Sequence, residues 1–292
     1  MKRPHGFTLV ELIVVMVIIG VLAGSITIYF GPAIQNFLDV RRRANLTDLA
    51  DGAVRTMTRD IRSAVSNSIH TPDTSCFELV PTSAGGRYRA APDTGYDATH
   101  AANTTKWVNT MTTTTQFDVL SQLTTAPAVG DFVVINNQDS TNVYTPVNST
   151  SRSTITGVAV LPATDNIGTY RLDINALRVD VGYDNARFVI VPAAQQAVFY
   201  VCSGANGIDS NGDGKGTLYR FSGYGFSINN TCPTPGANTP IVATKIQSCT
   251  FVYDPNSNNS GLNTGYMQIK LQLTESNQSV QIVVGTHTDN TP

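Results

Sequence analysis

A single carboxylate at the start of an otherwise apolar segment is the side chain whose position most strongly implies chemistry. Glu11 lies five residues after Gly6 and is followed by residues 12–30, a run of 19 residues without a charged side chain. A carboxylate in a membrane-spanning helix costs roughly 2.5–3.5 kcal/mol on insertion scales, so it is expected to have a cationic partner. A cut between Gly6 and Phe7 would create an α-amino group four residues before Glu11. The amine of a neighbouring chain would then neutralise the carboxylate and set the axial register between two helices.

The apolar run is long enough to span the hydrocarbon core of a membrane as a helix. A secretory signal peptide fits poorly, because no small-residue cleavage site interrupts the pattern after the run. An uncleaved signal anchor explains the length and the short basic segment before it, but it gives no reason for Glu11. The carboxylate therefore favours a helix that assembles with other helices over a simple anchor.

The junction around Gly6 carries a resemblance to a known family. Gly6 followed by Phe-Thr-Leu-Val-Glu-Leu-Ile is similar to the class III leader junction of type IV pilins and type II secretion pseudopilins. The resemblance implies cleavage after Gly6 and N-methylation of Phe7, both by the prepilin peptidase, and it implies that Glu11 serves recruitment into a filament. The implied partners are other major and minor pilins, the prepilin peptidase, an inner-membrane assembly platform and the lipid bilayer. The implied location is the inner membrane, crossed once with the head in the periplasm, and then the pilus on the cell surface.

Two shorter segments narrow the resemblance. Residues 57–64 (MTRDIRSA) and residues 218–220 (LYR) resemble the J-type minor pseudopilins and their counterparts in pili of the mannose-sensitive haemagglutinin (MSHA) type. This implies a minor pilin that acts in the initiation or tip complex of a pilus. Three alternatives stay open: a J-type minor pseudopilin of a type II secretion system, a tip adhesin, and an anchored periplasmic binding protein that never assembles.

The pattern along the chain predicts an α+β fold, in which a long N-terminal helix packs on an antiparallel β-rich head. We expect a leader peptide at residues 1–6, a transmembrane and assembly helix at 7–38, an amphipathic helix at 39–70 and one head at 71–292. Gly31 and Pro32 predict a kink or local melting of the helix, because proline removes a backbone hydrogen bond. Short β-branched runs separated by Gly, Pro, Asn and Asp indicate the strands of the head. The helix face expected to contact the head carries apolar residues at helical spacing, namely Leu46, Ala50, Ala53, Met57, Ile61 and Ala64.

Four cysteines in a chain that looks exported predict two disulfides. Four cysteines allow three pairings. Cys202 and Cys232 flank the LYR segment, whereas Cys76 and Cys249 each open a candidate strand, which favours the pairs Cys202–Cys232 and Cys76–Cys249. The chain has no CxxC pair, which argues against a zinc site.

The loop at residues 209–215 (DSNGDGK) is the strongest candidate for a metal site. Asp209, Asn211 and Asp213 place oxygen ligands at alternate positions before a glycine, as a calcium loop requires. An EF-hand would have a glutamate six residues after Gly214, and Arg220 stands there instead. Calcium is thus a possible cofactor of this loop, and an ordinary Asp/Asn/Gly turn is the alternative.

Composition excludes several other classes of function. Charged residues make up 14% of the 292 residues and the formal net charge is −2, so we expect no nucleic-acid partner. A hydrophobic fraction of 41% excludes a chain that is disordered throughout. The sequence contains no HExxH, no GxSxG and no phosphate-binding glycine loop. We therefore expect the chain to be no enzyme, but to be a substrate of the prepilin peptidase.

Overall fold

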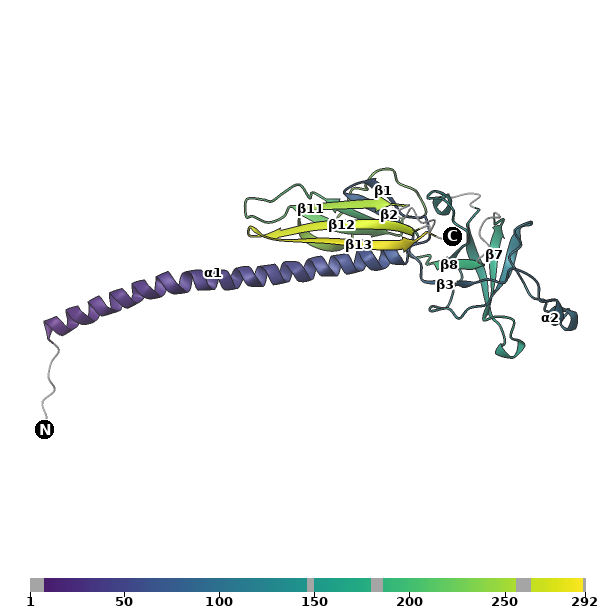
Figure 1. Cartoon of the computed structure of the whole chain (residues 1–292), viewed down its shortest axis with the longest axis horizontal. Helices are drawn as coiled ribbons and strands as arrows, with labels where there is room; N and C mark the ends of the chain where they lie inside the picture. Colours follow the sequence, from purple (N-terminus) through teal and green to yellow (C-terminus); the bar gives the residue numbers. More distant parts are fainter. Residues whose placement is uncertain (1–7, 146–149, 180–185, 256–263, 291–292) are drawn as a thin grey trace, which may run out of the picture.

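The computed structural model describes residues 8–145, 150–179, 186–255 and 264–290. One helix of 54 residues, α1 (Leu9–Arg62), extends from the N-terminal end of the molecule to a β-rich head (Figure 1). The strands of the head pair in antiparallel fashion. The predicted fold, a long N-terminal helix packed on an antiparallel β-rich head, is confirmed.

Helix α1 differs from its prediction in two places. It stays helical through Gly31 and Pro32, where we expected a kink or melting, and it curves smoothly in Figure 1. It also ends at Arg62, before the expected boundary at residue 70. The reason is local: Ser63 is the C-cap, and the N–H of Val65 donates to the carbonyl of Val80 on the head (2.8 Å) and not to the preceding helical turn.

The first sheet packs on the second half of α1. Its apolar side meets the predicted helix face, of which Leu46, Ala50, Ala53, Met57 and Ile61 are buried. Packing of this kind, rather than helix propensity, stabilises a helix in water. The order of the seven strands is β1-β2-β9-β10-β11-β12-β13. Their bounds are β1 (His70–Asp73), β2 (Cys76–Leu79), β9 (Val198–Ser203), β10 (Gly216–Ser222), β11 (Ile241–Asp254), β12 (Thr264–Glu275) and β13 (Gln278–Asp289).

A second sheet is formed by the chain between β2 and β9 and lies beyond the C-terminal end of α1 (Figure 1). Its order is β3-β8-β5-β6-β7-β4, and a bridge between Tyr88, just after β3, and Val119 of β4 joins the two outer strands. We expected the head to be one unit packed on the helix, but the strands packed on α1 belong to the first sheet. The bounds are β3 (Ala84–Arg87), β4 (Thr114–Val119), β5 (Phe132–Val134), β6 (Arg152–Val160), β7 (Tyr170–Leu177) and β8 (Arg187–Val191), with α2 (Thr94–Thr99) and two 3₁₀ turns, Asn142–Tyr144 and Ala163–Asp165, in the connections.

The two sheets share a small buried cluster at their junction. Val65, Val80, Val134 and Tyr144 belong to it. The hydroxyl of Tyr144 donates to the carbonyl of Ser68 (2.7 Å), which ties the second sheet to the segment that follows α1.

Candidate functional site

Glu11 forms a capping box at the first turn of α1. The Oγ1 of Thr8 accepts a hydrogen bond from the N–H of Glu11 (3.3 Å), and the Glu11 carboxylate accepts from the N–H (2.9 Å) and the hydroxyl (3.1 Å) of Thr8. The two side chains together thus satisfy two N–H groups that a helix start leaves unpaired, and the negative charge of Glu11 suits the positive end of the helix dipole. Both of these bonds to the carboxylate are accepted by Oε2, and within the described residues no group donates to Oε1, which leaves that oxygen for a further donor.

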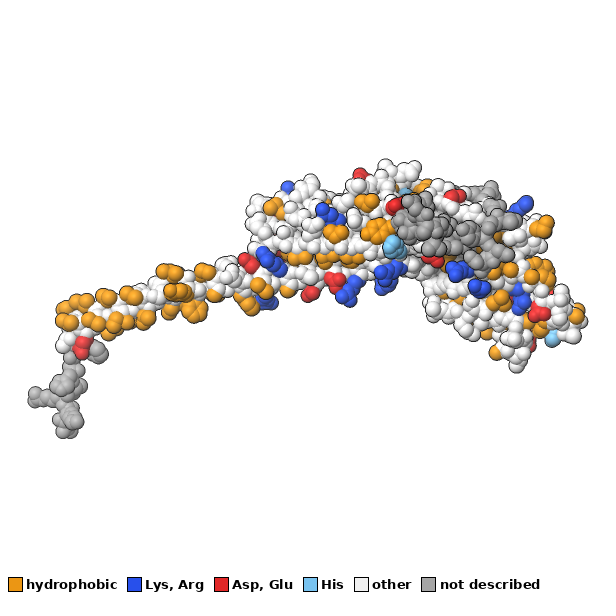
Figure 2. Space-filling model, in the orientation of Figure 1, with side chains coloured by type: hydrophobic (Ala, Val, Ile, Leu, Met, Phe, Trp, Pro, Cys, Tyr) orange, Lys and Arg blue, Asp and Glu red, His pale blue; other side chains and the backbone are white. Residues whose placement is uncertain are grey.

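The first half of α1 exposes a continuous apolar surface. No charged residue occurs between Glu11 and Asp39, a stretch of 27 residues that is about 40 Å long at 1.5 Å per residue. In Figure 2 this part of the helix is a rod outside the head that carries mostly apolar side chains. The helix is long and apolar enough to cross a membrane, and none of its most apolar stretch is buried inside the structure. An exposed apolar surface of this size needs lipid or other helices to cover it.

Arginines mark the point where the apolar surface ends. Arg41 lies over the ring of Phe37 (5.8 Å), Arg42 pairs with Asp39 (3.0 Å), and the Nε of Arg43 donates to the Oε1 of Gln278 on β13 (2.8 Å). The apolar part of α1 therefore passes into its head-bound part within one turn of the helix.

A buried charged group fastens α1 to the first sheet. Asp60 accepts hydrogen bonds from the hydroxyl of Tyr200 on β9 (2.7 Å) and from the Nε of Arg220 on β10 (2.9 Å). Burial and the adjacent Asp60 carboxylate raise the pKa of Tyr200 above its usual range. The guanidinium of Arg220 also donates to the Oε1 of Gln195 (2.8 Å). Its positive charge is thus paired with Asp60, and its N–H groups have acceptors in Asp60 and Gln195.

This contact joins the two segments that carried the narrower resemblance. Asp60 lies in MTRDIRSA and Arg220 lies in LYR, which are 160 residues apart. The sequence alone does not reveal this role, because an acidic residue among arginines on an amphipathic helix usually belongs to a solvated face. The sequence does contain one signal for this role. Asp60 lies between Met57 and Ile61, two residues of the buried helix face, at a helical spacing that places it at the edge of that face.

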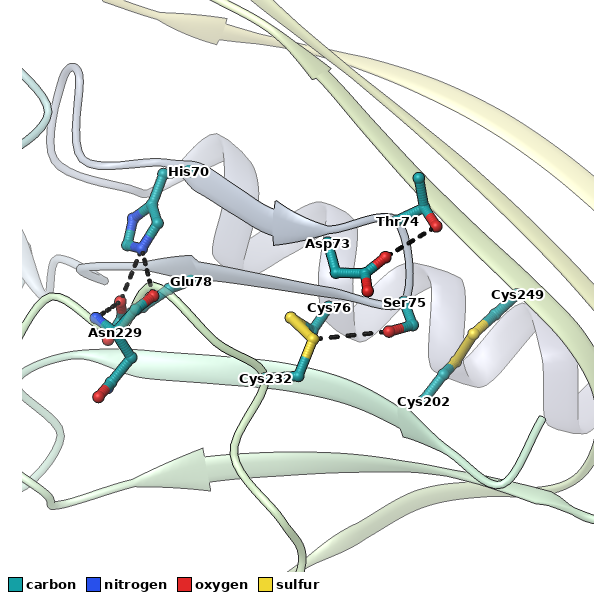
Figure 3. The surroundings of a disulfide bond; sticks show 10 residues. All are labelled: His70, Asp73, Thr74, Ser75, Cys76, Glu78, Cys202, Asn229, Cys232 and Cys249. Atoms are coloured by element: carbon teal, nitrogen blue, oxygen red, sulfur yellow. Dashed lines mark hydrogen bonds and ion pairs between the residues drawn. A yellow bond between two sulfur atoms is a disulfide. The ribbon is translucent and has the colours of Figure 1, made fainter. Parts of the chain in front are cut away.

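The disulfides are Cys76–Cys232 and Cys202–Cys249 (Figure 3). The predicted pairing, Cys202–Cys232 with Cys76–Cys249, is therefore wrong, although the expectation of two disulfides is confirmed. The segments that flank LYR are not joined to each other, since Cys232 bonds to β2 and Cys202 bonds to β11.

The pleat of the sheet explains the correct pairing. Cys76 on β2 lies opposite Val201 on β9, so the side chains of these two residues share one face of the sheet. Cys202 follows Val201 and must point to the other face, because successive side chains of a strand alternate. Accordingly Cys76 clusters with Phe199, Val201 and Cys232, whereas Cys202 packs with the helix-side core. Cys232 and Cys202 thus lie on opposite sides of the sheet and cannot bond.

A second buried carboxylate lies near Cys232 and holds the same segment of chain. Glu78 on β2 is fully buried, lies 3.0 Å from the Nε2 of His70 and accepts a hydrogen bond from the N–H of Asn229 (Figure 3). It also accepts a hydrogen bond from the hydroxyl of Tyr224. Burial and the Glu78 carboxylate raise the pKa of Tyr224 well above its usual range. The segment after β10 is thereby fixed to β2 by a disulfide and by these polar contacts.

The candidate calcium loop uses its carboxylates internally. The Oδ1 of Asp209 accepts from the N–H groups of Asn211 (2.8 Å) and Asp213 (2.9 Å), which lowers the pKa of Asp209. Asp213 accepts from the N–H of Ser276 (2.7 Å) and lies 3.7 Å from the Nζ of Lys245. Within the described residues, no three His, Cys, Asp or Glu side chains are placed to hold a metal. The arrangement is that of a hydrogen-bonded turn, and calcium binding at this loop stays an untested prediction.

The comparisons with known proteins support the reading of the N-terminus. The family model described as "Prokaryotic N-terminal methylation motif" matches residues 1–27. Neither the comparison with curated proteins nor that with solved structures gave a match. The matched part includes Gly6 and Phe7, which lie outside the described residues, and Glu11. The chain thus has the N-terminus of a prepilin-like protein, of the type IV pilin and pseudopilin kind, followed by an apolar helix that suits an inner-membrane anchor.

Proposed function

We propose that this prepilin-like chain is a minor pilin of an MSHA-type type IV pilus, similar to the minor pilin MshO, and that it acts in the initiation or tip complex of the pilus. The prepilin peptidase cleaves it between Gly6 and Phe7 and methylates the new amine. The chain itself catalyses no reaction. Its partners are other pilins, the peptidase and the inner-membrane assembly platform.

The observation that carries this proposal is the exposed apolar half of α1 with Glu11 at its start. The methylation motif covers Glu11 and the part of this segment up to residue 27, and the head buries none of its most apolar part. A helix that served only as an anchor would have no use for a carboxylate at this depth. The arrangement suits a helix that leaves the bilayer for a bundle of similar helices.

The geometry of Glu11 suggests how it enters such a bundle. Its Oε2 is engaged by Thr8 within the same helix, which fixes the carboxylate at the helix start. Its Oε1 is then directed to an amine from a neighbouring subunit, and in apolar surroundings that pair is strong because water does not screen it. The head, fastened by Asp60 and Arg220, determines which subunits lie beside it.

The first test is mass spectrometry of the intact chain and its N-terminal peptide from cells with and without prepilin peptidase. We expect a mature chain that begins at methylated Phe7 and is lost without the peptidase. A chain that begins at Met1 in both strains would be an uncleaved anchor and would contradict the proposal.

A deletion strain then separates the machines that use such subunits. Loss of surface pili with normal protein secretion supports the pilus role. Loss of secretion with normal pili would assign the chain to a type II secretion system as a J-type pseudopilin. Normal numbers of pili that no longer attach to cells or glycans would point to a tip adhesin.

A further inference from the structure

Strand β13 forms a long open edge of the first sheet. All twelve of its residues pair with β12 without a shift of register. The strand has no proline, and Asp289, its last residue, is its only Asp, Glu, Lys or Arg. Edges of this kind accept a further strand unless something blocks them.

The backbone on the outer side of β13 is unpaired. Ser276 and Asn277 both have positive φ (47° and 64°) and form a two-residue turn that closes on Glu275 and Gln278. Because hydrogen-bonded pairs alternate along an antiparallel ladder, the N–H and C=O groups of alternate residues point away from β12. These residues are Ser279, Gln281, Val283, Gly285 and His287, and in the described structure their backbone groups form no hydrogen bond to another element.

The other edges of the described sheets are protected. Strand β1 has four residues, includes Pro72 and shifts its register against β2. In the second sheet the two outer strands, β3 and β4, are joined through the bridge between Tyr88 and Val119. Only β13 combines length, regular pairing and open backbone groups among the edges that the structure describes.

Two arginines of α1 lie along this edge. Arg43 donates to Gln278 at the start of β13, and the Nε of Arg62 donates to the Oγ1 of Thr286 near its end (3.0 Å). Both guanidinium groups contact a neutral oxygen, and neither forms an ion pair with an acid of the described chain. Gln278 and Thr286 face α1 and are eight residues apart, about 27 Å along a strand.

We propose that β13 is the docking edge for an extended strand of a neighbouring pilin-like subunit that carries two carboxylates about eight residues apart. The backbone of that strand pairs with the open groups of β13. Its carboxylates, on the side that faces α1, pair with Arg43 and Arg62. The inference rests on the proposed function, because it names the surface through which the head contacts its neighbour.

Charge argues for a different subunit rather than a second copy of this chain. The residues of β13 that face α1 are Gln278, Val280, Ile282, Val284, Thr286 and Thr288, and none is acidic. Two β13 edges in contact would bring the arginines of both copies to one seam without a carboxylate on that face. Like charges in such an arrangement repel.

Hydrogen exchange on the full chain tests the edge directly. We compare the chain in detergent micelles with the chain in complexes purified from cells through a tag on it. In the complex, the amides from Ser279 to His287 should exchange about tenfold more slowly than in the isolated chain, as measured on peptides that span β13. Unchanged exchange there, in a complex that forms, would overturn the proposal.

Variants and a photo-crosslinker identify the partner. Val283→Pro removes one outward N–H, and proline is tolerated on an edge strand at such a position; Val283→Thr keeps the N–H and is its control. Arg62→Glu reverses one charge of the edge, and Arg87→Glu makes the same change on the second sheet. We expect the first member of each pair to lower the yield of complex about tenfold, a loss of about 1.4 kcal/mol, and the controls to leave it unchanged. Far-ultraviolet circular dichroism checks that each variant folds.

A benzophenone amino acid at Val283 should crosslink to an extended segment of another pilin-like subunit with two acidic residues at the stated spacing. A crosslink to β13 of a second copy, or equal yields from Val283→Pro and Val283→Thr, would overturn the edge proposal. Failure of the proposed function would give a different result: Glu11→Ala would have no effect, and the chain would enter no complex. In that case the edge proposal falls with it.

Discussion

Removal of Asp60 should loosen α1 from the head by a measurable amount. In the variant Asp60→Ala, Arg220 keeps a largely buried guanidinium without its acid and Tyr200 loses its acceptor. Breaking a buried ion pair costs about 3–5 kcal/mol. The side chain of Arg220 is 21% exposed, so water recovers part of that cost, and we expect a loss of about 2–3 kcal/mol. For a head of this size the melting temperature should fall by about 6–10 °C.

The assay is thermal unfolding of the full chain in detergent micelles, followed by near-ultraviolet circular dichroism of the head. Asp51→Ala is the matched control, because Asp51 forms an exposed ion pair with Arg55 on the same helix (2.7 Å). An exposed pair one turn apart contributes about 0.3–0.5 kcal/mol, so this control should change the melting temperature by no more than about 2 °C.

A double-mutant cycle separates the ion pair from the loss of packing. If the ion pair accounts for the lost stability, the double variant Asp60→Ala/Arg220→Met should be only slightly less stable than Asp60→Ala. The coupling energy between the two positions should then exceed about 1 kcal/mol. An Asp60→Ala variant that melts within 2 °C of the Asp51→Ala control would refute the argument that this group fastens the helix.

Three further predictions concern assembly, oxidation and pH. Glu11→Gln keeps the capping contact with Thr8 but removes the charge. The proportion of this variant recovered in filaments should therefore fall nearly as far as that of Glu11→Ala. A proportion equal to that of the wild type would mean that Glu11 serves only as a cap. Non-reducing peptide mapping should recover Cys76 joined to Cys232, and their joint replacement by serine should lower stability by about 2–5 kcal/mol, whereas a Cys76 peptide joined elsewhere would contradict the structure. Burial raises the pKa of Tyr144 well above 10. Above about pH 10, Tyr144 therefore keeps its proton in the folded chain and loses it in the unfolded chain. The free energy of unfolding should then fall by up to about 1.4 kcal/mol per pH unit. Melting curves between about pH 9 and 11 test this, and the fall should be shallower in Tyr144→Phe; equal slopes would disprove the assignment.

The open edge of β13 and the arginines beside it give the proposed minor pilin a directional surface. Arg43 and Arg62 lie at the two ends of β13, so the strand runs the same way as α1. A neighbour whose helix lies beside α1 in the same membrane would present its head to this edge. Recruitment through Glu11 and recognition through β13 would then act at opposite ends of one subunit.

The N-terminal segment could be interpreted from the sequence because its information is local. A helix needs only its own residues to place Thr8 beside Glu11, and an apolar run without charges suits a bilayer whatever follows it. The helix face that meets the head was also predictable, since Leu46, Met57 and Ile61 repeat at the helical period.

The disulfides, the second sheet and the partner of Asp60 depended on the tertiary structure. Whether Cys202 bonds to Cys232 or Cys249 is decided by which face of the sheet each side chain takes, and that follows from the register of β2 against β9. The chain between β2 and β9 leaves the first sheet to build another, and nothing in its strand pattern shows where it departs. The buried pairing of Asp60 with Arg220 needs β10 to lie beside α1, across 160 residues. Periodicity reports which face of an element is apolar, but only the packed fold decides which distant element that face will meet.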